Sequence, residues 1–139
     1  MQATTLDTVL KVSHLSKTVK TVDGPLTIMH DINFSVNASE SLAIVGTSGS
    51  GKSTLLGLLA GLDTPSQGQV ELMHRDISGA SEDERAQIHS HHVGFVFQSF
   101  QLIDHLTALE NVQLPLELSG MPRAEAASKA QVWLEKVGL

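Results

Sequence analysis

The stretch from Gly46 to Ser53 constrains this chain more than any other feature, because its sequence GTSGSGKS fits the pattern GxxxxGK[ST]. The glycines let the backbone curl so that successive N–H groups point inward toward an anion. Lys52 adds an ammonium for the β- and γ-phosphates of a nucleotide, and Ser53 adds a hydroxyl for Mg²⁺. The pattern therefore predicts a loop that binds the phosphates of a magnesium nucleotide, ATP above all.

The residues on either side of this loop place it in an α/β fold. Residues 42–45 are continuously apolar, which predicts a short strand covered on both faces. Leucines recur at helical spacing over 53–62, which predicts a helix that starts at the loop. The positive end of that helix dipole is directed toward the same anion.

An antiparallel ribbon is predicted ahead of the loop. Apolar and polar residues alternate from Leu26 to Val36, which indicates a strand with one buried face. The stretch Thr8–Leu15 is a suitable partner strand, with Asp23-Gly24-Pro25 as turn material between the two.

Two more strands and two helices are predicted after the loop. The strands are Gln69–Met73 and the continuously apolar Val93–Phe97, which ends at Gln98. Helices begin after Ser81 and after Thr107, because each of these residues has a glutamate three positions later and so forms a capping box.

A last helix closes the sequence. Pro122 is placed at its N-terminus and Gly138 is its predicted C-cap. Its apolar face carries Ala130, Trp133, Leu134 and Val137.

Composition excludes several classes of protein. The 139 residues suit one domain, and a net charge of −6 argues against a broad surface for nucleic acid. The chain has no cysteine, which fits a reducing cytoplasm and removes disulfides and thiolate chemistry. Since no apolar run approaches the ~18 residues of a membrane span, we expect no direct membrane insertion.

Two further blocks of sequence carry a resemblance to a known family. They are LLAGLDTPSQGQV, which follows the phosphate loop, and HVGFVFQSFQLIDHLTALENVQLP at His92–Pro115. With the loop itself, they resemble the ATPases of ABC transporters over residues 8–139. The chain is most similar to the lipoprotein-releasing and macrolide-exporting group.

The resemblance implies a fold class: an α/β P-loop NTPase with an ABC-type ATP-binding core, incomplete here, and an N-terminal antiparallel β-subdomain. All of 1–139 would belong to one nucleotide-binding domain. Its parts would be the β-subdomain at 8–40, the Walker A to Q-loop core at 41–115 and the start of the helical subdomain at 116–139.

The resemblance also implies roles for individual residues. Lys52 and Gln98 would contribute to catalysis, Ser53 and Gln98 would meet Mg²⁺, and Val19 would lie where the family stacks an aromatic ring on adenine. The implied nucleotide-binding residues are Gly46, Thr47, Ser48, Gly49, Ser50, Gly51, Lys52, Ser53, Thr54 and Val19.

Partners and location follow from the same resemblance. Residues 99–110 would receive the coupling helix of a membrane permease, which places the chain in the cytoplasm, peripheral on the inner face of the cell membrane. We expect a homodimer or a swapped oligomer, because sheet edges left open invite pairing with another chain.

Two departures from the family pattern bear on activity. Val19 replaces the aromatic ring, which forfeits ~0.5–1.5 kcal/mol of stacking. The sequence ends at Leu139, ahead of where the family has its signature, Walker B aspartate, catalytic glutamate and switch histidine. Because phosphoryl transfer needs a positioned nucleophile and a second electrostatic clamp, the expectation is weak Mg-ATP binding without turnover by this chain alone.

Three alternatives remain open at this point. An ABC ATPase of DNA repair would carry a long coiled-coil insertion after Gln98 and a more basic surface. A small P-loop kinase would lack the FVFQSFQLI stretch at 95–103 and carry an arginine-rich lid, which this sequence does not show. A non-catalytic interaction module would compete with a longer relative for the permease, and co-purification with a permease would reveal it.

Overall fold

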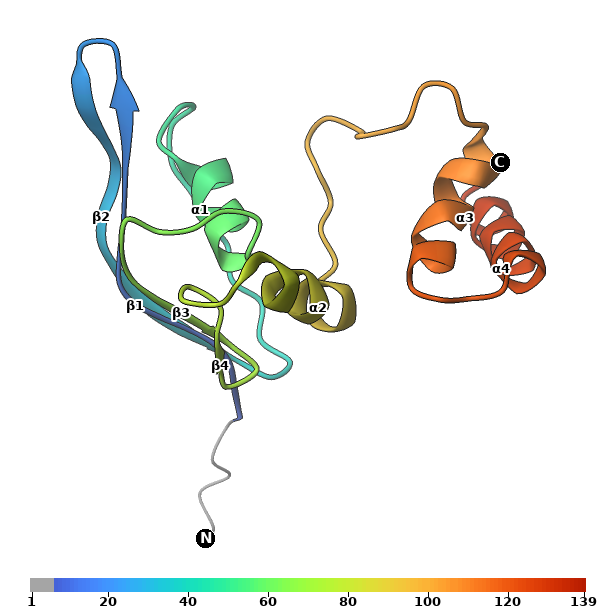
Figure 1. Cartoon of the computed structure of the whole chain (residues 1–139), viewed down its shortest axis with the longest axis horizontal. Helices are drawn as coiled ribbons and strands as arrows, with labels where there is room; N and C mark the ends of the chain where they lie inside the picture. The colour runs from blue at the N-terminus through green and yellow to red at the C-terminus, as the bar shows by residue number, and fades with distance from the viewer. Residues whose placement is uncertain (1–6) are drawn as a thin grey trace, which may run out of the picture. The chain divides into compact units, whose positions relative to one another are not determined.

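The computed structural model describes residues 7–139, which divide into two compact units, one ending at Gly94 and the other spanning Phe95–Leu139. The elements of the described residues are β1 (Thr8–Thr21), β2 (Gly24–Asn37), α1 (Lys52–Leu59), β3 (Gln67–Leu72), β4 (Arg75–Asp76), α2 (Glu82–His92), α3 (Ala108–Leu118) and α4 (Arg123–Lys136) (Figure 1).

The first unit contains an antiparallel sheet with the strand order β2-β1-β3-β4. The predicted ribbon is confirmed: β1 pairs with β2 from Thr8–Asn37 to Thr21–Gly24. Its first strand continues past the predicted end at Leu15, because β2 offers a pairing partner as far as the turn. Strand β3 pairs with β1 over a shorter stretch, from Leu10 to Ser16.

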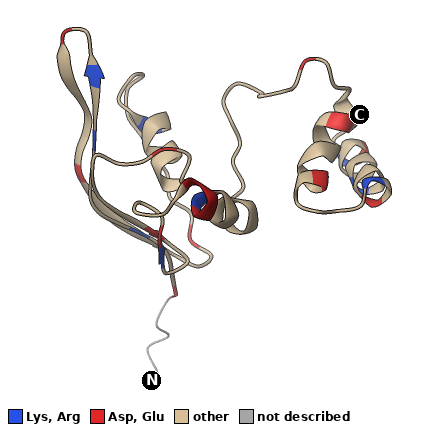
Figure 2. Ribbon diagram, in the orientation of Figure 1, with Lys and Arg blue, Asp and Glu red and all other residues tan. Residues whose placement is uncertain are grey.

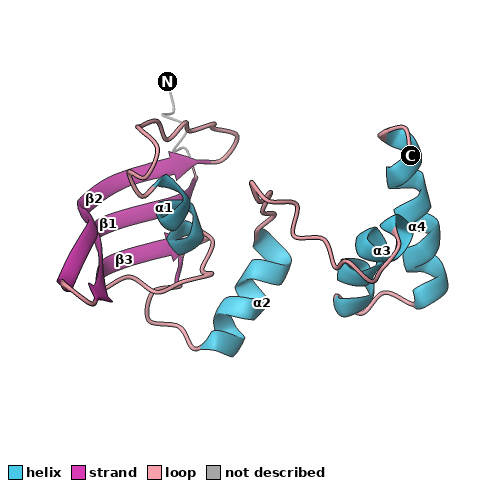
Figure 3. Cartoon of the chain, turned by 90° about the horizontal axis from the view of Figure 1, so that it is seen from above, coloured by secondary structure: helices cyan, strands magenta, loops and turns pink. Residues whose placement is uncertain are grey.

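Helix α1 lies on one face of this sheet (Figure 3). Leu58 of the helix is buried together with Leu15 of β1 and Val70 of β3. Full burial of such side chains stabilises a fold by about 1.5–3 kcal/mol each. The full core cluster is Val12, Leu15, Leu55, Leu58, Val70, Ile77 and Ile88. The helix that follows the phosphate loop is therefore fixed to the sheet by apolar packing.

Two predicted strands are wrong in the described structure. Residues 42–45 and 93–97 take no strand conformation, and neither segment joins the sheet within 7–139. Val45 is 87% exposed and Val96 is 96% exposed. The physical reason is that a strand buried on both faces forms only beside neighbouring strands. An apolar run shows that its side chains favour burial, but it does not show which segments would bury them.

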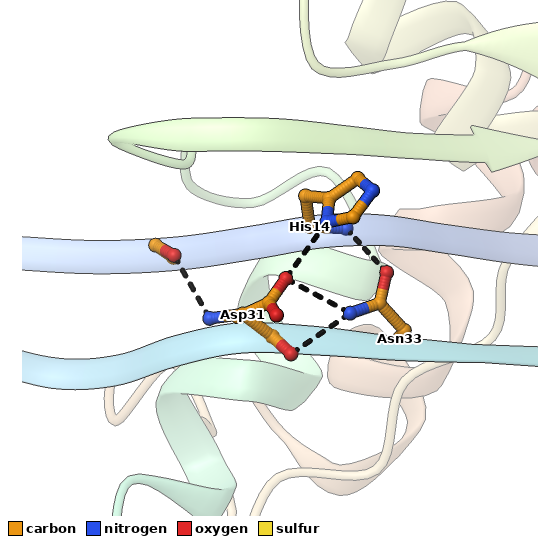
Figure 4. A network of polar contacts seen from close by, with 4 residues as sticks. His14, Asp31 and Asn33 are labelled. Atoms are coloured by element: carbon orange, nitrogen blue, oxygen red, sulfur yellow. Dashed lines mark hydrogen bonds and ion pairs between the residues drawn. The ribbon is translucent and has the colours of Figure 1, made fainter.

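A polar network joins β1 and β2 where both strands bulge. The pairing register shifts at His14 and at Asp31, and these residues have left-handed φ angles of 50° and 49°. Asn33 Nδ2 donates to Asp31 Oδ1 at 2.9 Å, and His14 Nδ1 lies 2.8 Å from the same oxygen (Figure 4). The backbone N–H of His14 also donates to Asn33 Oδ1 at 2.7 Å. The network therefore stabilises two backbone conformations that side chains rarely adopt.

Asp31 makes the stability of this ribbon depend on pH. The Asn33 amide, and after it the His14 ring, hold the pKa of Asp31 below its usual value of 3.8. A depressed folded-state pKa adds stability at neutral pH that is lost as the pH falls below about 4. We expect Asp31→Asn to flatten this decline in urea unfolding between about pH 6 and pH 3. The exposed turn variant Asp23→Asn should keep the original decline, and an unchanged profile for Asp31→Asn would contradict the assignment.

Local signals place the helix starts correctly. Ser81 and Glu84 form the predicted capping box of α2, and Thr107 and Glu110 form that of α3. Acidic residues gather in the first turn of α2, where the helix dipole favours them (Figure 2). Pro115 does not end α3, which continues to Leu118.

The second unit is built on the packing of α3 against α4. Ala126 and Ala130 of α4 are fully buried, and Gln113 of α3 is buried and hydrogen-bonded to Glu117. Trp133, predicted on the apolar face, is 57% exposed, and Lys136 Nζ lies 4.3 Å from its ring centroid. Among residues 7–139, helices with the length and apolar character of a membrane span are absent.

Candidate phosphate-binding site

The loop from Gly46 to Gly51 leads directly into α1. Gly49 and Gly51 have φ angles of 78° and 86°, a conformation that glycine adopts without strain. Gly51 is the N-cap residue of α1. Among the described residues, no side chain forms a capping hydrogen bond at the N-terminus of this helix. The first N–H groups of α1 are therefore available to an anion.

Lys52 places its ammonium inside the curl of the loop. Its Nζ donates to the carbonyl oxygens of Gly46 at 2.9 Å and Thr47 at 2.6 Å, and lies 3.3 Å from Ser50 Oγ. The positive charge is thus concentrated where the loop backbone turns around it. Ser53 follows on the exposed side of the first turn of α1, and Thr54 beside it is half-buried.

Two glycines of the loop differ in what a side chain there would meet. A Cβ on Gly46 would stand 2.8 Å from Ser50 Oγ, a hydroxyl that can rotate away. A Cβ on Gly51 would stand 2.8 Å from Ile28 Cγ2 and 3.3 Å from the carbonyl oxygen of Ile28. The phosphate loop is therefore packed directly against strand β2.

Ile28 is a contact that sequence reasoning missed. It lies at a register shift of the ribbon, between the pairs Lys17–Met29 and Thr18–Thr27. The bulge brings β2 against the start of α1. The alternating pattern of this strand predicts a pleated face and gives no signal for the bulge.

The other two predicted site residues, Val19 and Gln98, lie in different units of the chain. Val19 is half-buried in β1 opposite Leu26, in the same unit as the phosphate loop. Gln98 is exposed and belongs to the second unit, just after Phe95 and Phe97, whose ring centroids are 4.5 Å apart. The loop, the ribbon and Val19 thus belong to the first unit, whereas Gln98 belongs to the second.

The second unit carries an apolar groove of about 430 Å³. Its walls come from the segment before α3, from α3 itself and from the end of α4. The lining residues are Leu102, Ile103, Asp104, Leu106, Ala108, Asn111, Val112, Leu134 and Leu139. Asn111 fixes the segment before α3, since its Oδ1 accepts from the Ile103 N–H at 2.8 Å and its Nδ2 donates to the Leu106 carbonyl at 3.1 Å.

A glycine loop that encloses a lysine ammonium at an uncapped helix start is the arrangement of the P-loop class of phosphate-binding proteins. A family profile described as ABC transporter matches residues 29–139. The chain therefore belongs to the ABC transporter family, among its ATP-binding proteins. This excludes the non-ABC P-loop alternative.

Individual relatives agree with this assignment. The uncharacterized ABC transporter ATP-binding protein YbbA of Escherichia coli (strain K12) is 46% identical over 133 residues, which cover 96% of this chain and 58% of YbbA. The lipoprotein-releasing system ATP-binding protein LolD of Hydrogenovibrio crunogenus is 44% identical over 135 residues, again covering 96% of this chain and 58% of the relative. The chain thus spans somewhat more than half the length of these curated relatives.

The fold class is confirmed by a solved structure. The ATP-binding cassette MJ0796, in a dimeric post-hydrolysis state bound to ADP and Pi, matches with a TM-score of 0.85 and 36% sequence identity. The match covers 91% of this chain and 56% of that structure. The antiparallel N-terminal sheet and the following P-loop therefore have the arrangement of an ABC-type ATP-binding core.

Proposed function

We propose that the chain binds the triphosphate of Mg-ATP in the loop Gly46–Ser53, as the nucleotide-binding part of an ABC transporter. The observation that supports this most is the position of Lys52 Nζ, within 2.9 Å of two loop carbonyls at the uncapped start of α1. A triphosphate at this point would accept hydrogen bonds from the lysine and from the first N–H groups of the helix.

Ser53 is the proposed protein ligand of Mg²⁺, and Gln98 is the proposed second contact to the metal. Replacing Ser53 by alanine removes a hydroxyl that only the magnesium complex uses. We expect Ser53→Ala to lower the affinity for ATP by about tenfold in Mg²⁺, which is ~1.4 kcal/mol, and to change it little in EDTA. Displacement of a fluorescent ATP analogue measures both. Ser53→Thr keeps the hydroxyl and serves as the control, and an equal loss with and without Mg²⁺ would refute the role.

Val19 is the proposed neighbour of the adenine ring. It lies on the same ribbon as Ile28, and Ile28 packs against Gly51 of the phosphate loop. A valine presents apolar surface without an aromatic face, so we expect weak discrimination between ATP and GTP. A preference of more than about tenfold for ATP would contradict this assignment.

A membrane permease is the proposed partner, and the groove before α3 is its proposed docking site. The groove is apolar and its walls include Leu102, Ile103 and Leu106, within residues 99–110. A short amphipathic helix inserts its apolar face into grooves of this kind. Docking would place the chain at the inner face of the cell membrane. Co-purification with a permease should be lost in Ile103→Asp and kept in the exposed variant Gln101→Asp, and equal retention would reject the site.

A second copy of the chain is the other proposed partner. MJ0796, which shares this fold, forms a dimer bound to ADP and Pi. We propose that two copies associate here as well, and light scattering that shows a monomer at all concentrations with Mg-ATP would overturn this.

A further inference from the structure

Lys17 of β1 reaches across to the segment that follows α1. Its Nζ lies 2.7 Å from Asp63 Oδ2 and donates to the carbonyl oxygen of Thr64 at 2.7 Å. The Lys17 side chain is only 14% exposed, whereas the Asp63 side chain is 48% exposed, so the lysine is packed into the fold while its partner carboxylate stays partly in water. The Lys17 ammonium holds the pKa of Asp63 below its usual range, and the Asp63 carboxylate is therefore charged at neutral pH.

Ser66 strengthens the same connection. The Thr18 N–H donates to Ser66 Oγ at 3.0 Å, and Ser66 Oγ donates to the Thr18 carbonyl at 3.1 Å. The Ser66 N–H donates to the carbonyl oxygen of Ser16 at 2.9 Å. Residues 16–18 of β1 are thus joined to residues 63–66 through side chains on both segments.

This connection lies where the ribbon loses the support of its third strand. Strand β3 stops pairing with β1 at Ser16, and from Lys17 to Thr21 the strand β1 is paired with β2. A two-stranded ribbon by itself is only marginally stable in water. The contacts of the Lys17 side chain and of the Thr18 backbone take over where the third strand ends, and they hold the part of the ribbon that carries Val19.

Besides the apolar packing of β1 on α1 in the core, the ribbon meets the elements of the phosphate site at two further points. Ile28 of β2 packs against Gly51 at the start of α1, and Lys17 of β1 binds Asp63 beyond the end of the same helix. Beyond Ser16, where β3 no longer pairs with β1, one of these contacts alone would hold this part of the ribbon at a single point. Two contacts at opposite ends of α1 define its orientation relative to the loop.

We infer that Lys17 and Asp63 are positioning residues, which hold the ribbon at the distance from the phosphate loop that lets the base of a bound nucleotide meet Val19. The inference rests on the proposed nucleotide site. Neither residue touches the phosphates; their effect is confined to the part of the affinity that the base and ribose contribute.

Inorganic tripolyphosphate separates this effect from phosphate binding. The Mg²⁺ complexes of ATP and of tripolyphosphate are each titrated against the chain, and the ratio of the two affinities measures the base-dependent part. We expect Lys17→Met and Asp63→Asn to lower the affinity for ATP by about three- to tenfold, the scale of one apolar contact to a ring, and to change that for tripolyphosphate less than twofold. Lys17→Arg should restore the ratio, and Lys20→Met, an exposed lysine of the same strand, should leave it unchanged.

Each result decides a different question. Asp63→Asn is the milder variant. If it lowers the affinities for ATP and for tripolyphosphate to the same extent, the pair only supports the fold and the inference is overturned. An unchanged ratio in both variants would overturn it as well. If the original chain binds ATP and tripolyphosphate equally, the inference fails while phosphate binding stands. If it binds neither, the proposed function itself fails.

Discussion

Replacing Lys52 by alanine is expected to lower the affinity of the chain for Mg-ATP by at least about a hundredfold, which is ~2.7 kcal/mol or more. The reason is the position of the ammonium, which lies within 2.9 Å of the Gly46 and Thr47 carbonyls in the curl of the loop. Its loss leaves those oxygens facing the phosphates without a compensating charge. Displacement of a fluorescent ATP analogue measures the change.

The folded state should tolerate this substitution. The Lys52 ammonium is bonded to an exposed loop, so we expect the unfolding midpoint of Lys52→Ala to stay close to that of the original chain. Lys20→Ala, on an exposed part of β1, is the charge-matched control and should bind as the original does. A loss of less than about fivefold in Lys52→Ala would contradict the proposed site.

Replacing Gly68 by alanine should destabilise the first unit by about 3–5 kcal/mol. Gly68 has a φ of 84°, and a Cβ there would overlap the carbonyl oxygen of His14 and stand 2.6 Å from the N–H nitrogen of Leu15. Both obstacles are backbone atoms of the adjoining strand, which cannot rotate away. Faster amide hydrogen exchange throughout β1 and β3 would report the loss.

A matched variant separates the overlap from the backbone strain. Gly61 has a φ of 73°, and a Cβ on it would meet only ordinary contacts, at 3.6 Å from Ile77 Cδ1. Gly61→Ala should therefore cost about 1–2 kcal/mol, the strain term alone. Equal losses of stability in Gly68→Ala and Gly61→Ala would mean that the close approach of Gly68 to the His14 backbone adds nothing to the cost of a side chain there.

Signals that act over a few residues predicted the structure best. Each capping box, such as Ser81 with Glu84, is complete within one helical turn and needs nothing from the rest of the fold. The curl of the loop is similar, since the glycines Gly49 and Gly51 and the Lys52 ammonium lie on one short segment. These features were predictable because neighbours in sequence are neighbours in space.

Contacts between distant segments were not predictable in the same way. Lys17 meets Thr64 across a separation of 47 residues, and the Ile28 contact to Gly51 depends on a bulge that the alternating pattern does not show. The left-handed conformations of His14 and Asp31 have only a weak sequence signal, the tolerance of polar residues for that region. The apolar side chains of residues 42–45 predict a buried strand because they favour burial. That preference does not indicate which strands would lie beside them.

Calorimetric titration of the folded chain with Mg-ATP is the most direct test of the phosphate site. A curled loop that holds the Lys52 ammonium at the start of α1 should give a saturable heat with one nucleotide bound per chain. The same titration of Lys52→Ala should give no such heat. An absence of binding heat for the original folded chain at millimolar Mg-ATP would contradict the account.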